Sequence, residues 1–210
     1  EIAETGRKIV LILINGRPLD LSEIVDKVDA ILEAWFPGEE TAEAIWDIIL
    51  GKYSPSGKLP ISFPKSVGQI PCYYHRKESS KVNYVFLDSQ PLFPFGYGLS
   101  YTEFEYSNIE IEKKKITPGE KIIVKAEVKN KGRKEGSEIV QLYIKDIVAS
   151  VVPPSLQLKG FVKVNLKPEE KVKITFEIPS EILAFHNQDM KLVIEPGKYK
   201  VFIGSSSVDL

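Results

Sequence analysis

The sequence predicts a chain of two parts, an incomplete parallel α/β segment followed by an antiparallel β-sandwich. Apolar, β-branched runs alternate with amphipathic stretches over the first 50 residues, which is typical of α/β folds. From residue 104 onward, short stretches alternate apolar and polar residues, as half-buried strands do. We expect the α/β part over residues 1–64, an ordered linker over residues 65–101 and the sandwich over residues 102–210.

The predicted parallel strands are two continuous apolar runs. Residues 8–14 read KIVLILI, and residues 30–36 read AILEAWF. Such runs suit strands covered on both faces, as in parallel sheets. Each run ends at turn residues, the first at NGRP and the second at PG.

A helix is expected after each of these strands. Residues 21–28 could form the first, with Asp20 or Ser22 as its N-cap. Residues 41–50 could form the second, which Gly51 would end. The apolar positions expected to face inward are Leu21, Ile24, Val25 and Val28 in the first helix, and Ala44, Ile45, Ile48 and Ile49 in the second.

Two parallel strands are too few for a stable sheet, so this segment should bury apolar surface against something outside itself. A companion segment, a second copy of the chain or tight packing on the linker could provide that cover. The only methionine is Met190, so we expect that Glu1 is not the initiator and that more chain precedes it.

Residues 51–101, which include this linker, lack sustained periodicity, and about fifty residues are too many for a compact structureless loop. We therefore expect an ordered, extended connection that wraps over neighbouring surface. The aromatic residues expected to fix it are Phe63, Tyr73, Tyr74, Phe86, Phe93, Phe95 and Tyr97.

The alternating region predicts six or seven short strands separated by Pro/Gly turns, a β-sandwich of immunoglobulin or fibronectin type III kind. No cysteine pair marks a true immunoglobulin domain. The expected core set is Ile122, Val124, Ala126, Val128, Ile139, Leu142, Ile144, Phe161, Val164, Ile174, Phe176, Val201 and Ile203.

Composition and charge exclude several classes of partner. Lys plus Arg total 28 against 29 for Asp plus Glu, so no charge imbalance favours nucleic acid or an acidic membrane surface. No apolar run reaches the roughly 18 residues that span a membrane. Cys72 is the only cysteine and lacks ligands at zinc spacing, so we expect a half-buried loop thiol and no metal site.

Residues that usually carry catalysis are scarce. The two histidines, His75 and His186, are not near a nucleophile motif, so structural roles are favoured for both. The Gly-x-Gly at Gly96 and Gly98 lacks the preceding strand and following helix of a phosphate-binding loop. We therefore assign no catalytic residue within the chain.

Five polar and aromatic residues follow the two predicted strands and are candidates for the rim of a substrate site. Asn15 and Arg17 follow the first strand, and Phe36, Glu39 and Glu40 follow the second. Ligand crevices of open α/β sheets form at the carboxyl ends of the strands. The alternative is structural: Glu39 and Glu40 would stabilise the helix N-terminus by about 0.3 to 1 kcal/mol, with Arg17 as a local ion-pair partner.

Four segments of the sequence resemble the C-terminal third of bacterial glycoside hydrolase family 3 enzymes, the β-glucosidases and β-xylosidases. In chain order they read ILINGRPLDL, AWFPGEETAEAIWDIILGKYSPSGKLPISFPKSVGQIPCYYH, PLFPFGYGLSYTEFEYSNI and EPGKYKVFIGSSS. The resemblance runs essentially from end to end.

The resemblance implies a parent with an N-terminal barrel, an α/β-sandwich domain and a fibronectin type III-like domain. Residues 1–64 would then be the C-terminal piece of the α/β-sandwich domain. The family's nucleophilic aspartate and acid/base glutamate would both precede Glu1, so the chain alone would be inactive. The implied reaction is retaining removal of terminal β-D-glucosyl or β-D-xylosyl residues from oligosaccharides, with no cofactor. The partners would be the missing barrel, the rest of the α/β-sandwich domain and the oligosaccharide.

A second class of function stays open, in which the β-sandwich is a module that binds carbohydrate or a protein partner. Binding sandwiches usually display a row of exposed aromatic residues. Here the aromatics mostly occupy inward-type positions, and tryptophan is absent after Trp46, which favours a supporting role. The compartment is undecided between the cytoplasm, which we favour, and export directed by a leader outside this sequence.

Overall fold

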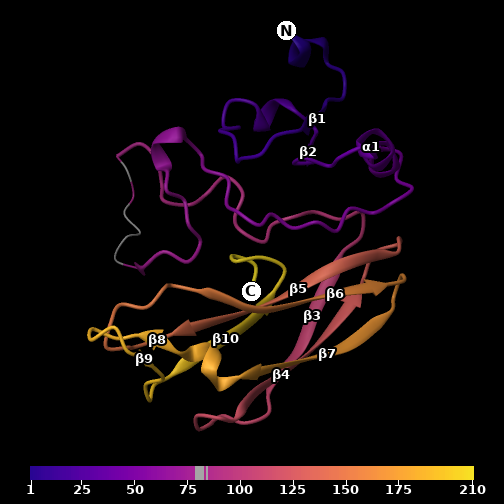
Figure 1. The fold of residues 1–210 in the computed structure, drawn as a ribbon. Coiled ribbons are helices and arrows are strands. Elements are labelled where there is room, and N and C mark those ends of the chain that lie inside the picture. The colour runs from indigo at the N-terminus through magenta and orange to yellow at the C-terminus, as the bar shows by residue number, and fades with distance from the viewer. Residues whose placement is uncertain (79–82, 84) are drawn as a thin grey trace.

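The structure is a computed structural model that describes residues 1–78, 83 and 85–210. Figure 1 shows the α/β elements at one end of the molecule, the β-sandwich at the other and the linker between them. The predicted combination of a parallel α/β segment and an antiparallel sandwich is confirmed.

The two parallel strands are shorter than predicted. β1 (Val10–Leu13) pairs in parallel with β2 (Ala30–Glu33), from Val10 opposite Ala30 to Leu13 opposite Glu33. A short 3-10 helix, η1 (Ile2–Thr5), precedes them. One face of β1 packs against the linker, and this small cluster contains Leu11, Leu13, Leu19, Leu21, Ile31, Trp35, Leu59, Phe63, Leu92 and Phe93.

The prediction of a helix over residues 21–28 is wrong. Only a turn and the 3-10 helix η2 (Val25–Lys27) form there. Asp20 Oδ1 accepts hydrogen bonds from the backbone N–H and the hydroxyl of Ser22, as the predicted N-cap would, but the turn that Val25 N–H closes on the carbonyl of Leu21 continues only as η2. So short a segment also gains little from helix propensity when few of its residues pack on the sheet.

The second helix is confirmed as α1 (Thr41–Ile49), and Gly51 ends it with φ of 69°. The predicted inward face is only partly right. Ile45 and Ile48 are half-buried, whereas Ala44 and Ile49 are exposed. The described chain does not cover that side of the helix.

The linker is ordered where the structure describes it, as predicted. An isolated bridge joins Phe63 to Phe93, and η3 (Val67–Gln69) is a short 3-10 helix within the linker. The rings of Tyr74 and Phe95 stack with centroids 4.1 Å apart, and those of Phe93 and Tyr97 with centroids 5.5 Å apart.

Two of the aromatic residues expected to fix the linker do not do so. Tyr73 is exposed, and Phe86 is 96% exposed. Aromatic character alone does not show which rings meet a partner, because that depends on the path of the chain.

The sandwich consists of two three-stranded sheets, with strand orders β10-β5-β6 and β3-β4-β7. A small hairpin of β8 (Phe185–His186) and β9 (Leu192–Val193) lies after the 3-10 helix η5 (Ser180–Leu183). The six main strands are β3 (Phe104–Ile111), β4 (Lys121–Asn130), β5 (Gly136–Asp146), β6 (Gln157–Leu166), β7 (Lys171–Pro179) and β10 (Tyr199–Gly204).

Most of the predicted sandwich core is confirmed, but two members are wrong. The side chain of Phe161 is 67% exposed, and Ile139 lies on the outer face of β5. The even-numbered positions of β5 and β6 point inward, so Val140 and Leu166 are buried instead. The full buried core is Ile122, Val124, Ala126, Val128, Val140, Leu142, Ile144, Leu166, Ile174, Phe176, Ile178 and Ile203.

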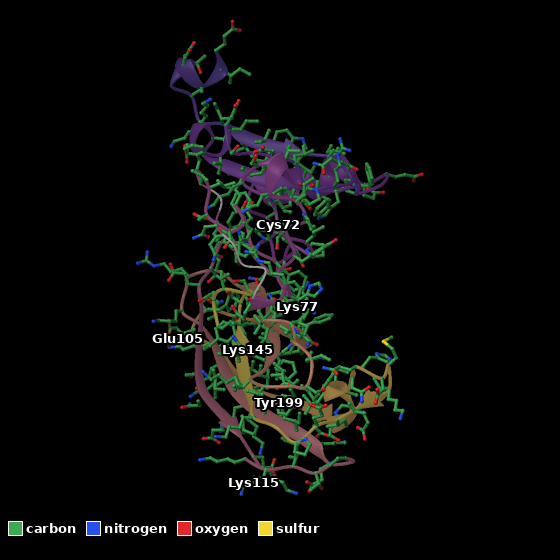
Figure 2. All side chains as sticks on the ribbon, turned by 90° about the vertical axis from the view of Figure 1, so that its left-hand side faces the viewer. Cys72, Lys77, Glu105, Lys115, Lys145 and Tyr199 are labelled. Atoms are coloured by element: carbon green, nitrogen blue, oxygen red, sulfur yellow. The ribbon has the colours of Figure 1, made fainter. Side chains whose placement is uncertain are left out.

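The linker packs on the outer face of β5. Gln141 Nε2 donates to the carbonyl of Gly96 at 3.1 Å, and the Tyr74 ring packs edge-on against Tyr143 with centroids 6.2 Å apart. Gly96 has φ of 81° and its backbone lies against Gln141, which explains a glycine at this position. In Figure 2, Cys72 lies in the linker and Lys145 on the side of the sandwich that faces it.

A buried ion pair also joins the end of the α/β part to the sandwich. Lys58 Nζ lies 3.0 Å from a carboxylate oxygen of Glu138, and both side chains are almost fully buried. Burial raises the pKa of the Glu138 carboxyl, although Lys58 acts against that rise. Burial and the nearby Glu138 raise the pKa of the Tyr106 hydroxyl well above its usual range.

Candidate functional site

The turns after β1 and β2 meet at the carboxyl edge of the small sheet. The Asn15 amide donates to Glu33 Oε2 at 3.5 Å, and Glu33 Oε1 accepts the backbone N–H of Trp35 at 3.0 Å. Asn15 Oδ1 also accepts the backbone N–H of Arg17 at 3.1 Å. Asn15 and Glu33 therefore link the two turns through side chains.

Sequence reasoning missed Glu33. It is the last residue of β2, and a carboxylate that ends an otherwise apolar strand was the available signal. Its two oxygens hold the first turn and the start of the second. Glu33 thus belongs to the framework behind the predicted rim residues.

Phe36 lies over the first turn. A Cβ placed on Gly16 would lie 2.5 Å from Phe36 Cε2, so a larger residue at position 16 would displace this ring from its place over the turn. The ring is otherwise open, with Phe36 77% exposed. Trp35 has φ of 52° and packs on Phe63, with centroids 6.1 Å apart, and this left-handed residue directs the chain toward Phe36.

Glu39 and Glu40 are exposed at the start of α1. Glu40 is the N-cap residue, but its side chain makes no capping hydrogen bond. In the described part of the chain, no ion pair joins either carboxylate to Arg17. The structure therefore brings Asn15 and Phe36 to one edge, and it leaves Arg17, Glu39 and Glu40 as exposed groups around it.

One face of the sheet beside this edge is bare. Val10, Ile12 and Ile14 are exposed, whereas Leu13, on the other face, is buried under the linker. Strands of a parallel sheet are normally covered on both faces. The exposed side chains form an apolar surface that ends at the candidate rim.

The described residues provide no cluster of three or more His, Cys, Asp or Glu side chains that could hold a metal ion. Cys72 is half-buried, as predicted, and burial raises the pKa of its thiol. Within the described part of the chain, none of the helices is long and apolar enough to cross a membrane.

Comparison with protein families identifies both parts of the chain. Residues 1–101 match the glycosyl hydrolase family 3 C-terminal domain, and residues 138–207 match the fibronectin type III-like domain. The chain belongs to glycosyl hydrolase family 3. The resemblance seen in the sequence is therefore confirmed.

Family 3 relatives match nearly the whole chain. A periplasmic beta-glucosidase of Salmonella typhimurium is 46% identical over 97% of the chain, and the match covers 28% of that relative. A putative beta-xylosidase of Formosa agariphila is 44% identical over the full chain and is covered to 28%. The chain thus spans somewhat more than a quarter of the length of these relatives.

A solved family 3 structure has the same fold. The crystal structure of a beta-glucosidase from Listeria innocua in complex with glucose superposes with a TM-score of 0.95 at 38% identity. The match covers 99% of this chain and 30% of the other.

Proposed function

We propose that this chain is the C-terminal portion of a retaining β-glycosidase that removes terminal β-D-glucosyl or β-D-xylosyl residues from oligosaccharides. The family match and the names of the relatives support the reaction class. The observation that carries the proposal is the small sheet, where a bare apolar face ends at an edge formed by Asn15, Glu33 and Phe36.

The bare face of β1 is the proposed contact with the rest of the parent. Burying apolar side chains contributes about 25 cal/mol per Å² removed from water, so exposed Ile12 and Ile14 favour a partner surface. We infer that further strands of the α/β-sandwich domain and an N-terminal barrel provide it. The division of this chain at residues 64 and 101 stays a prediction.

The rim residues are proposed to contact the sugar that leaves. Phe36 would give an apolar wall, and Asn15, Arg17, Glu39 and Glu40 would hydrogen-bond hydroxyl groups or hold a neighbouring loop. None would break the glycosidic bond. The two carboxyl groups that a retaining mechanism needs would lie in the part of the parent outside this chain, and the reaction needs no cofactor.

Steady-state kinetics of the full-length parent test the rim. Phe36→Ala should lower kcat/KM on a disaccharide roughly tenfold, because a buried phenylalanine contact is worth about 1.5 kcal/mol or more. The effect on an aryl glycoside should differ, since the leaving group differs. Glu39→Gln should alter KM more than kcat.

Two matched controls separate a rim effect from a general one. Phe161→Ala removes an exposed ring from the sandwich, and Glu181→Gln neutralises a carboxylate in the first turn of η5. Both should leave the kinetic constants unchanged. Unchanged constants for Phe36→Ala and Glu39→Gln as well, with lowered folding stability, would favour the helix-terminus role and remove these residues from the site.

The chain alone should hydrolyse neither aryl β-glucosides nor aryl β-xylosides, because the proposed pair of catalytic carboxyl groups lies outside it. The measurement is release of the aryl alcohol by the purified chain. Turnover that a carboxylate substitution within the chain abolishes would contradict the proposal.

For the compartment we retain two candidates, the cytoplasm and export. The relative from Salmonella typhimurium is named a periplasmic enzyme, which supports export. Fractionation of the source cells with an assay for glycosidase activity distinguishes the two.

A further inference from the structure

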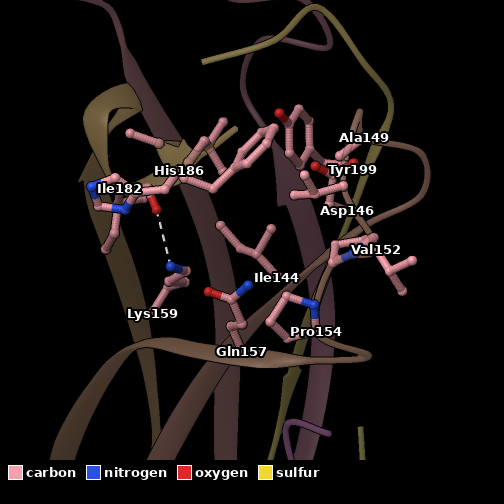
Figure 3. Close-up of a pocket in the computed structure, with 15 residues that line it drawn as sticks. Ile144, Asp146, Ala149, Val152, Pro154, Gln157, Lys159, Ile182, His186 and Tyr199 are labelled. Atoms are coloured by element: carbon pink, nitrogen blue, oxygen red, sulfur yellow. Dashed lines mark hydrogen bonds between the residues drawn. The ribbon is translucent and has the colours of Figure 1, made fainter. Parts of the chain in front are cut away.

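The sandwich has a cavity of about 290 Å³ at one end of its β10-β5-β6 sheet. Figure 3 shows it between the ends of these strands and the segment formed by η5 and β8. Its apolar lining includes Ile144, Leu183, Phe185 and the ring of Tyr199. The buried core ends at Ile144, and beyond it polar side chains occupy the inner face of the sheet.

A β-bulge turns Lys159 into this cavity. Leu142 pairs with Gly160 and Tyr143 pairs with Leu158, so Lys159 is an extra residue in β6. A Cβ on Gly160 would lie 3.2 Å from core residue Phe176, so residue 160 faces inward. The bulge lets its neighbour Lys159 face inward too, where regular alternation would have placed it outside.

The side chain of Lys159 is half-buried where it lines the cavity. It donates one hydrogen bond, to the carbonyl of Ile182 at 3.0 Å, as Figure 3 shows. Among the described residues no carboxylate forms an ion pair with it. Burial lowers the pKa of this ammonium. A lysine has three donors, so acceptors from a ligand would stabilise it.

A carboxylate lies on the opposite side of the same cavity. Asp146 continues the inward positions of β5 and pairs in register with Tyr199. It accepts the backbone N–H of Val148 at 3.2 Å, and no ion pair of the described residues includes it. Burial raises the pKa of its carboxyl group. Gln157 pairs with Ile144 and adds an amide that can donate and accept.

We propose that this cavity binds one saccharide unit, with Lys159 donating a hydrogen bond to a hydroxyl oxygen, Asp146 accepting a hydrogen bond from a hydroxyl group and the ring of Tyr199 or Phe185 against the apolar face of the sugar. A simple anion would be attracted by Lys159 but repelled by Asp146. A simple cation would be attracted by Asp146 but repelled by Lys159. Hydroxyl groups both donate and accept, so one neutral sugar satisfies both. The volume lies at the small end for ligand pockets, which favours one ring over a chain.

This site does not depend on the proposed function, because it requires no catalytic group. It differs from the arrangement considered from the sequence, since it has no row of exposed aromatics. Its aromatic and charged residues come from strand ends, where the sandwich opens.

The test follows isoleucine methyl resonances of the full-length protein that contains this chain. Ile144→Val and Ile182→Val assign the two signals at the cavity. D-Glucose and D-xylose should each shift both signals in a saturable way, and L-phenylalanine, a zwitterion with an apolar ring, should not. Sugar bound at a catalytic site would shift other signals, so the readout separates this site from the proposed reaction.

The roles of Lys159 and Asp146 can each be tested by one substitution with a matched control. Lys159→Met and Asp146→Asn should each weaken binding about tenfold, the loss expected for a hydrogen bond to a charged group. Lys163→Met, on the outer face of β6, and Asp189→Asn, at an exposed turn, should stay within twofold. The Ile174 signal reports folding of each variant.

Absence of a saturable shift at Ile144 and Ile182 with either sugar overturns the proposal, and so does a shift with phenylalanine alone. Undiminished binding in both folded variants overturns it as well. If neither variant folds, the wild-type titration alone decides.

Discussion

The two ends of the molecule differ in how much of their apolar surface the described chain buries. The sandwich encloses a continuous core in which Val124, Val128, Val140 and Leu142 are fully buried. Among the described residues, the cluster of the β1–β2 sheet has only Leu13, Leu21 and Phe63 as buried apolar residues, and one face of β1 is open. Folding stability should therefore lie mainly in the sandwich, while the α/β segment supplies the candidate site and relies on a partner.

The largest expected effect is at the junction of these regions. Lys58→Met should destabilise the protein by about 3 to 5 kcal/mol near pH 7, because it leaves Glu138 as an uncompensated buried charge. Urea unfolding measures the loss. Lys52→Met removes an exposed ion pair with Asp47 and should cost less than about 1 kcal/mol. An equally small loss for Lys58→Met would mean that the junction does not couple the regions.

The buried Glu138 carboxyl makes the folding stability depend on pH, and the sign of this dependence follows from its pKa. Burial raises the pKa of Glu138 above its ordinary value of 4.5, so the folded state holds the proton to higher pH than the unfolded state. The resulting stability is complete below pH 4.5 and is lost as pH rises through the folded pKa. Glu138→Gln should remove that slope, and a double change of Lys58→Met with Glu138→Leu should recover much of the stability.

One isoleucine from each region tests the difference in burial between the sandwich and the α/β segment. Ile174→Ala in the sandwich core should cost about 2 to 5 kcal/mol, because a buried side chain leaves a cavity. Ile12→Ala on the bare face, where the side chain is 37% exposed, should cost less, about 1 kcal/mol in the isolated chain. In the full-length parent the Ile12→Ala cost should rise if a partner covers that face. Denaturant unfolding of both forms tests this, and a small loss for Ile174→Ala would place it outside the core.

The smallest effects are pKa shifts of exposed carboxylates. The hydrogen bond from Lys113 lowers the pKa of Glu120 to about 2, and that from Lys8 lowers the pKa of Asp29. Stability from either group is present above its unfolded pKa and lost as pH falls through the folded pKa. NMR titration of the isolated chain should find Glu120 near this low value and Asp29 closer to its ordinary one if the α/β segment opens. Lys113→Met should raise the pKa of Glu120, whereas Lys52→Met should not.

Much of the fold could be predicted because periodicity is a local property. The alternation in β4 and β7 identified Val124, Val128 and Ile174 as core, and Gly51 marked the end of α1. The prediction of a helix over residues 21–28 failed because apolar spacing fits a compact turn as well as a helix, and the turn that Asp20 caps does not propagate beyond η2. For the candidate site, the turns after β1 and β2 were named, but Glu33 was missed although a carboxylate at the end of an apolar strand was a signal for it.

The sequence by itself determined the two fold types, their order along the chain, most of the sandwich core and membership of the family through its motifs. Tertiary structure alone decided the register of β5 with β6, and therefore that Phe161 faces outward and Lys159 inward. It also decided the pairing of Lys58 with Glu138 and of Asn15 with Glu33. Local sequence fixes which residues alternate, but a bulge, a shared cavity or a buried ion pair depends on contacts between residues far apart in the chain.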